Sequence, residues 1–163
     1  MLKIYKSRKN FPKTFIINKR NIQNILGDSC VIEHVGSTAV LGVAGKGIID
    51  ILIGFDNEEQ IKVAVMSLTD NGYFSGRINS SRTDRIFMAS SEDDTTLGDV
   101  HLHLVMKESK DFGKFIKVRD FLRQNPEEAK KYSELKFKIA QETGNDREEY
   151  KKRKSKFVQA ILE

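Results

Sequence analysis

One short stretch constrains the fold of this chain more than any other. The run Ile48-Ile49-Asp50-Ile51-Leu52-Ile53 places a single carboxylate, Asp50, among five aliphatic side chains. A run of this length and composition predicts a largely buried β-strand. A buried carboxylate is costly unless it meets a cation, a metal ion or several hydrogen-bond donors. The run therefore predicts a sheet with a charged site, the alternative being that Asp50 only caps a neighbouring loop.

Strand and helix patterns alternate along the first part of the chain, residues 1–106, and only helical patterns follow in residues 107–163. The strands that we expect are 30–35, 48–53, 85–89 and 100–105, with a polar loop at 90–98. The helices that we expect begin near Asn10, Asn57, Phe112, Asn125 and Asp146, and capping residues or a proline at the first position mark most of these starts. The pattern predicts one domain of the α/β (α+β) class with a helical C-terminal part.

Composition and charge limit the classes of function. The chain of 163 residues has one cysteine, Cys30, and no apolar run of about 18 residues, so we expect a cytoplasmic protein without a disulfide or a membrane span. The net charge of +5 lies wholly in residues 107–163, where acidic and basic residues are interleaved. We interpret this part as a solvated helical surface and expect no nucleic-acid partner.

A glycine turn follows the first predicted strand. Gly36 lets the backbone turn sharply and lets a ligand approach closely, and the hydroxyls of Ser37 and Thr38 can donate to an anion. His34 comes just before the turn, and we expect its imidazole to brace it. Taken alone, such a turn is also compatible with a purely structural role.

The predicted strand 100–105 carries two histidines in an alternating pattern. His101 and His103 point to one face of the sheet, about 6.5 to 7 Å apart along the strand. If that face also bears Asp50, the three side chains could bind zinc, manganese or iron. Two alternatives remain, namely general acid–base chemistry by His103 and a hydrogen-bonded arrangement that only orients Asp50 or a substrate.

The helical part contains candidate ligand contacts. Arg119 and Arg123 are four residues apart, so they share a helix face and could bind phosphate or carboxylate. The alternative is that Asp120 and nearby acidic residues pair with them at the surface.

Tyrosine and lysine pairs recur further along this part. We interpret the rings of Tyr132 and Tyr150 as core, with Lys136 and Lys154 reaching solvent, and retain Lys136 as a candidate ligand contact.

Together these segments resemble a known family. The spacing from Gly36-Ser37 to Asp50-Ile51-Leu52-Ile53 is similar to the nucleotidyltransferase superfamily pattern, in which Gly-Ser precedes Asp, an apolar residue and a second Asp or Glu. The stretch His34 to Val40 resembles the GrpB-like branch of that superfamily. Further segments match the branch in order: Gly42, Lys46, Gly72-Tyr73, Arg82, Arg85 to Phe87, His101 to Val105, Arg119 to Arg123, Tyr132 with Lys136, and Tyr150 with Lys154.

The resemblance implies a fold and a set of roles. The fold is a small mixed sheet flanked by helices. Asp50 would bind a divalent metal (magnesium or manganese, with zinc as the alternative), and a nucleoside triphosphate would be the substrate. The residues that would contact its phosphates or the rest of the ligand are Gly36, Ser37, Thr38, Lys46, Arg85, Arg119, Arg123 and Lys136.

Two departures from the superfamily pattern limit the functional prediction. Leu52 stands where the second carboxylate is expected, and the strand expected to carry a third carboxylate offers His101 and His103 instead. Magnesium prefers oxygen ligands, so imidazole is a poor replacement. Three functions remain: transfer of a nucleoside monophosphate to an unknown acceptor, non-catalytic binding of a nucleotide or phosphorylated metabolite, and metal-dependent hydrolysis at Asp50 and the histidines. The oligomeric state is not indicated.

Overall fold

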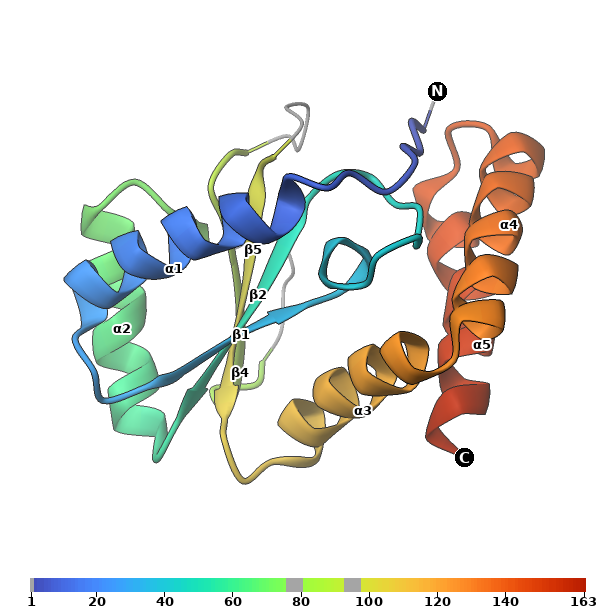
Figure 1. Cartoon of the computed structure of the whole chain (residues 1–163). Helices are drawn as coiled ribbons and strands as arrows, with labels where there is room; N and C mark the ends of the chain where they lie inside the picture. Colours follow the sequence, from blue (N-terminus) through green and yellow to red (C-terminus); the bar gives the residue numbers. More distant parts are fainter. Residues whose placement is uncertain (1, 76–80, 93–97) are drawn as a thin grey trace.

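The computed structural model describes residues 2–75, 81–92 and 98–163 and contains a five-stranded mixed sheet with helices on both faces (Figure 1). The strand order is β1-β2-β5-β4-β3, and the β2–β5 pair is parallel whereas the other pairs are antiparallel. The strands are β1 (Val31–Val35), β2 (Ile49–Phe55), β3 (Phe74–Ser75), β4 (Arg85–Ala89) and β5 (Val100–Met106).

Four of these strands coincide with the segments expected from the sequence. The fifth, β3, was not expected, because its two residues are both exposed and have no apolar alternation to mark them. Residues 93–97 of the expected polar loop lie outside the described residues.

The helices also follow the expected starts. They are α1 (Phe11–Leu26), the short 3₁₀ helix η1 (Ser37–Ala39), α2 (Glu58–Asp70), α3 (Lys110–Gln124), α4 (Pro126–Thr143) and α5 (Arg147–Leu162). The Asn57 side chain accepts from the Gln60 amide and the Asp146 side chain accepts from the Glu149 amide, as N-caps do. The expected side-chain cap of α4 is wrong: Asn125 also ends α3, and its Nδ2 donates to the Phe121 carbonyl at 2.8 Å.

Side chains along β2 and β5 point alternately to the two faces of the sheet, so each face packs against a different set of helices. Ile49, Ile51 and Ile53 of β2 belong to the core beneath α1 and α2, together with Leu102 and Leu104 of β5. Since neighbouring residues of a strand point to opposite faces, Asp50, Leu52, His101 and His103 face the other side. The charged candidates therefore share a face with the C-terminal helices.

Helix α3 covers part of that second face, and α4 and α5 pack beyond it (Figure 1). Leu52, which has no exposed surface, packs with Val35 and Val105 against Phe112, Phe115 and Ile116. Tyr132 of α4 stacks on Phe157 of α5 with ring centroids 4.6 Å apart. No helix in the described part of the chain is both long and apolar enough to cross a membrane.

Replacing Leu52 with alanine should lower the free energy of unfolding by about 2 to 5 kcal/mol, because it leaves a cavity between the sheet and α3. Urea denaturation followed by circular dichroism measures this change. Val63→Ala on α2, where the side chain is 57% exposed, is the matched control and should change it by less than about 0.5 kcal/mol. Equal effects of the two substitutions would contradict the role given to Leu52.

Candidate functional site

The parallel pairing of β2 with β5 brings Asp50 and both strand histidines together. Asp50 is in register with His101, and Leu52 with His103. His103 Nε2 lies 3.0 Å from Asp50 Oδ1, and His101 Nδ1 lies 3.6 Å from the same oxygen. Phe87 of β4 packs its ring edge-on to both imidazoles, at 4.8 Å from His101 and 5.6 Å from His103. The strand pairing alone thus assembles an aspartate–histidine cluster.

Asp50 is held in its ionised form. Burial opposes ionisation, but the hydrogen bonds from His101 and His103, and the charge of these rings when they are protonated, outweigh it and hold the pKa of Asp50 well below its ordinary value. An ionised carboxylate can only accept hydrogen bonds, so His103 Nε2 donates to Asp50 Oδ1. In the neutral ring this leaves Nδ1 of His103 as the nitrogen that can accept a proton.

The glycine turn is fitted closely around the same carboxylate. Gly36 has a φ of +72°, and a Cβ at this position would lie 2.5 Å from Asp50 Oδ2. Gly45 leaves room for Ser37 in the same way. A Cβ added at Gly45 would lie 2.1 Å from Ser37 Oγ and 3.9 Å from Lys136 Nζ. Gly36 therefore allows the turn to pass close to Asp50, and Gly45 leaves room for the Ser37 side chain with Lys136 Nζ nearby.

Lys136 is a buried lysine, not a lysine that reaches solvent as we expected from its spacing. It is 4% exposed, its Nζ donates to the Ala44 carbonyl at 2.8 Å, and it lies over the Tyr132 ring at 4.3 Å from the centroid. The expectation was wrong because α4 packs against the loop that carries Ala44, where Ser133 Oγ also donates to the Gly42 carbonyl.

Two further lysines lie near enough to Lys136 to repel its charge. Burial first, and then the charges of Lys154 and Lys46, lower the pKa of Lys136 well below its ordinary value, against the opposite effect of Asp50. The pKa of Lys154 is lowered in the same way, with burial as the largest cause. No salt bridge joins any of the three to a carboxylate in the described residues. We call Lys46, Lys136 and Lys154 the lysine cluster.

Lys154 was not among the predicted site residues, although the sequence carries a signal for it. Tyr150 and Lys154 on α5 repeat the four-residue spacing of Tyr132 and Lys136 on α4, and Lys154 lies over the Tyr150 ring at 5.8 Å. Both helices therefore place a lysine over the ring of a tyrosine four residues earlier, and this repeated pair is the signal for Lys154.

His34 and Thr38 lie behind the glycine turn, away from Asp50. His34 Nε2 is 2.9 Å from Thr38 Oγ1, and its ring stacks on Phe15 of α1 at 4.6 Å. Thr38 is 5% exposed, so its hydroxyl faces His34 and not the lysine cluster. Burial is the largest cause that lowers the pKa of His34 to about 4, and the ring is therefore neutral near pH 7. His34 thus contacts a residue of the turn, and its bracing role stays a prediction.

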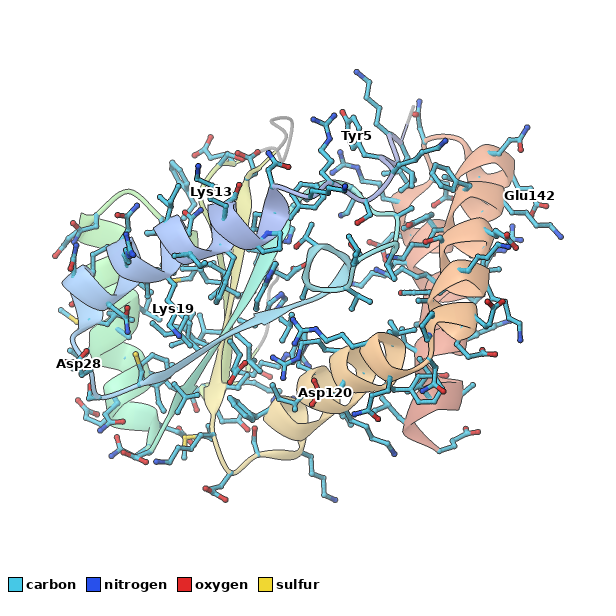
Figure 2. The ribbon with its side chains drawn as sticks, in the orientation of Figure 1. Tyr5, Lys13, Lys19, Asp28, Asp120 and Glu142 are labelled. Atoms are coloured by element: carbon cyan, nitrogen blue, oxygen red, sulfur yellow. The ribbon has the colours of Figure 1, made fainter. Side chains whose placement is uncertain are left out.

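The three arginines predicted as ligand contacts lie away from the lysine cluster. Arg85 pairs with Asp111 at 3.2 Å and is 43% exposed. Arg119 Nη1 pairs with Glu33 Oε2 at 2.6 Å, and Arg123 Nε donates to the Ala39 carbonyl at 3.0 Å. Arg119 of α3 thus contacts Glu33 and the His34 carbonyl of β1. In Figure 2, β1 runs between the labelled Asp120 of α3 and Lys19 of α1.

The donor set at Asp50 does not fit the pair of magnesium ions that the superfamily uses. Leu52 supplies no oxygen and is packed under α3, and both histidines direct a ring nitrogen at Asp50 Oδ1. Within residues 2–75, 81–92 and 98–163, no three His, Cys, Asp or Glu side chains are placed so that they could hold one metal ion. We therefore assign no chemical step to a metal.

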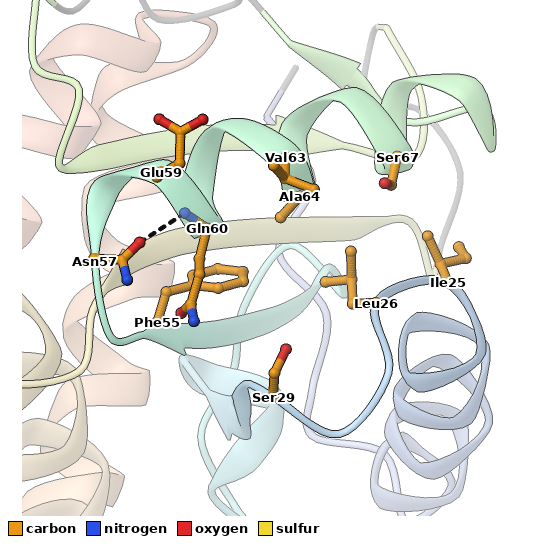
Figure 3. Close-up of a pocket in the computed structure, with 10 residues that line it drawn as sticks. All are labelled: Ile25, Leu26, Ser29, Phe55, Asn57, Glu59, Gln60, Val63, Ala64 and Ser67. Carbon is orange, nitrogen blue, oxygen red and sulfur yellow. Dashed lines mark hydrogen bonds between the residues drawn. The ribbon is translucent and has the colours of Figure 1, made fainter.

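A separate hollow of about 430 Å³ lies between α1 and α2 (Figure 3). Its walls are mainly apolar, as with Leu26, Phe55 and Ala64, and Glu59 is the only ionisable side chain among the described residues that line it. It opens on the side of the sheet opposite Asp50, so it is not part of the candidate site.

Comparison with known proteins gives close relatives along the whole chain. A family model described as "GrpB protein" matches residues 1–163. A UPF0157 protein of Halalkalibacterium halodurans is 32% identical over 155 residues, which cover 93% of this chain and 76% of that protein.

Solved structures with a similar fold include a GrpB protein and a terminal uridylyl transferase. The crystal structure of the conserved protein GrpB from Enterococcus faecalis has a TM-score of 0.79 at 23% identity and covers 99% of this chain and 100% of that one. Terminal uridylyl transferase 4 from Trypanosoma brucei, solved with bound dUTP, has a TM-score of 0.60 at 9% identity. It covers 96% of this chain, which spans about half the length of that transferase (53%). The chain thus has the fold of nucleotidyltransferases.

His34 should make stability depend on pH. Its pKa is about 4 in the folded protein against 6.5 for an ordinary histidine, so the unfolded chain binds the proton more readily between these values. The free energy of unfolding should fall as the pH drops from 6.5 to 4, by up to about 3 kcal/mol from this residue. Urea denaturation at pH 7 and pH 4.5 measures the loss in wild type and in His34→Gln, which should lose about 2 kcal/mol less. Parallel losses in the two proteins would show that His34 is not the cause.

Proposed function

Because this chain belongs to the GrpB protein family, whose fold it shares with nucleotidyltransferases, we propose that it binds the phosphate groups of a nucleoside triphosphate at Ser37 and the lysine cluster. The transferase that shares its fold was solved with dUTP. Nucleotide binding is therefore an established use of this architecture in another protein.

The observation that carries the proposal is that Ser37 Oγ and Lys136 Nζ both border Gly45, where a Cβ would lie 2.1 Å and 3.9 Å from them. Since Gly45 has no side chain, the Ser37 hydroxyl and the buried Lys136 amine are both open to the space beside it. Lys46 and Lys154 add positive charge nearby. Burial is the largest cause that lowers the pKa of Lys136 and of Lys154, and repulsion from neighbouring lysines lowers both further. A polyphosphate would relieve this repulsion and accept hydrogen bonds from both groups.

Asp50 limits how the phosphates are placed. It is ionised and 25% exposed in its side chain, and it lies next to Gly36. Its charge repels phosphate oxygens, which favours the lysine side of Ser37 for the phosphate chain. The Asp50–His103 pair would then lie beside the phosphates and not under them.

Lys136→Met should weaken the binding of a nucleoside triphosphate, or of inorganic tripolyphosphate, at least tenfold. Methionine keeps the length and packing of the side chain but removes the charge and the donor beside Ser37. Isothermal titration calorimetry with ATP, UTP and tripolyphosphate measures the change. Lys138→Met, an exposed lysine on the same helix, is the matched control and should bind as wild type does.

Equal binding by Lys136→Met and wild type would overturn the phosphate assignment. Wild type that binds none of the three probes would overturn it as well. Thermal unfolding of each variant provides the check that a loss of binding is not a loss of folding.

Nucleotidyl transfer is the second candidate, and the hydrogen bond between His103 and Asp50 favours it. In this step Nδ1 of His103 would take the proton of an acceptor hydroxyl, whose oxygen attacks the α-phosphorus. The bond from that phosphorus to the bridging oxygen breaks, and pyrophosphate leaves with its charge facing the lysine cluster. Asp50 would hold the imidazole in the required tautomer and stabilise its positive charge.

Asp50→Asn and His103→Gln should each lower pyrophosphate release at least 100-fold, the ordinary contribution of a positioned base. Release is measured from a mixture of ribonucleoside triphosphates with the small-molecule fraction of a cell extract as the source of acceptor. Triphosphate binding should change less than threefold in His103→Gln and should not weaken in Asp50→Asn, which removes a negative charge beside the phosphates. Absence of release by wild type, or full release by His103→Gln, would exclude this step and leave the binding function.

A further inference from the structure

A second hollow, of about 310 Å³, lies outside the edge strand β1 between α1 and α3. It is separate from Ser37 and the lysine cluster, because none of those residues lines it. We call it the edge pocket. Its volume is at the lower end of the range for small-molecule sites.

One wall of the edge pocket is apolar. Phe15 and Ile16 of α1 and Ile32 of β1 form this wall, and Ile16 is 48% exposed there. The Phe15 ring is fixed in place by its stack on His34. A rigid apolar wall of this size suits the hydrocarbon or aromatic body of a small molecule.

Basic residues line the pocket on both of its helices. Lys19 of α1 and Arg119 and Arg123 of α3 line it together with one carboxylate, Glu33. Glu33 and Asp120 both pair with Arg119, at 2.6 Å and 2.8 Å, so the charge of Arg119 is more than balanced. With Lys19 and Arg123 included, one net positive charge remains around the pocket, and Arg123 presents it from α3 opposite Phe15 and Ile16.

Arg123 has hydrogen-bond donors that could bind a ligand. Its Nε donates to the Ala39 carbonyl, and its terminal nitrogens have no hydrogen-bond partner among the described residues. Burial and the neighbouring charge of Arg119 lower its pKa, so an anion beside it would be favourable. The fork of a guanidinium suits carboxylate and phosphate groups, which it binds with two parallel hydrogen bonds.

The pocket is also connected to the glycine turn. Arg123 holds the carbonyl of Ala39, the last residue of η1, and Arg119 Nη1 donates to the carbonyl of His34 at 3.2 Å. Both contacts fix the backbone on either side of Ser37. An occupant of the edge pocket would therefore act on the residues that position Ser37.

We propose that the edge pocket binds a small organic anion, with its carboxylate or phosphate group on Arg123 and Lys19 and its apolar body against Phe15, Ile16 and Ile32. This site is distinct from the phosphate site at Ser37 and does not rest on the proposed function. The anionic group and the apolar body are both required, so an inorganic anion alone binds more weakly.

The test uses the full chain with three probes: phenyl phosphate, benzoate and inorganic phosphate. Binding is followed by NMR chemical-shift changes of Phe15 and Ile16. Phenyl phosphate or benzoate should shift these signals, and inorganic phosphate should need at least a tenfold higher concentration. The aromatic probe that binds more tightly identifies the anionic group as phosphate or carboxylate.

Two variants test the two walls. Arg123→Gln should weaken the binding of the aromatic probes at least tenfold, and so should Ile16→Glu, which places a negative charge on the exposed part of the apolar wall. Lys114→Gln, an exposed residue of α3, is the control and should bind as wild type does.

Lys136→Met separates this proposal from the phosphate site, because it should leave the Phe15 and Ile16 shifts unchanged. Equal loss in Lys136→Met and Arg123→Gln would place the probes at Ser37 and overturn the edge pocket. Wild type that shows no shifts, or Arg123→Gln and Ile16→Glu that both bind as wild type does, would overturn it too.

Discussion

The hydrogen bond from His103 Nε2 to Asp50 Oδ1 is the interaction on which the rest of the site depends. Together with His101, it allows β2 to carry an ionised carboxylate in the middle of an aliphatic strand, where an unpaired charge would be costly. Because β2 and β5 are parallel and in register, the same pairing directs both histidines to the face covered by α3. Gly36 then closes over Asp50 from the neighbouring turn.

Packing on this face of the sheet accounts for the difference between this site and the two-metal arrangement of the superfamily. Leu52 is a core residue that joins the sheet to α3, so its position is occupied by packing instead of a second carboxylate. The positive charge that metal ions would otherwise supply to a polyphosphate is present as the lysine cluster. Under the proposed function, the lysine cluster and the His103 base are the groups that this chain itself would offer to a nucleotide.

Local patterns predicted the strands and the site residues that lie on them. The aliphatic run marked β2, and the alternation of His101 and His103 placed both on one face, where the structure puts them beside Asp50. The burial of Lys136 and the partner of the α3 face depend on long-range packing, which local sequence patterns do not reveal. The spacing of Tyr132 and Lys136 is compatible with either a solvated or a buried lysine, and only the packing of α4 against the loop of Ala44 selects burial. Likewise, helical spacing put Arg119 and Arg123 on one face but could not show that this face meets β1.

The proposed function depends on Lys136, a buried lysine that would meet phosphate beside Ser37. The most direct measurement is the pKa of Lys136, followed by NMR of the labelled lysine side chain in the free protein and with tripolyphosphate. We expect a pKa for Lys136 below its ordinary value in the free protein, and a rise when tripolyphosphate binds, because the ligand stabilises the charged form. The exposed Lys138 is the reference in the same spectra. A pKa equal to that of Lys138, or one that tripolyphosphate leaves unchanged, would contradict the proposed function.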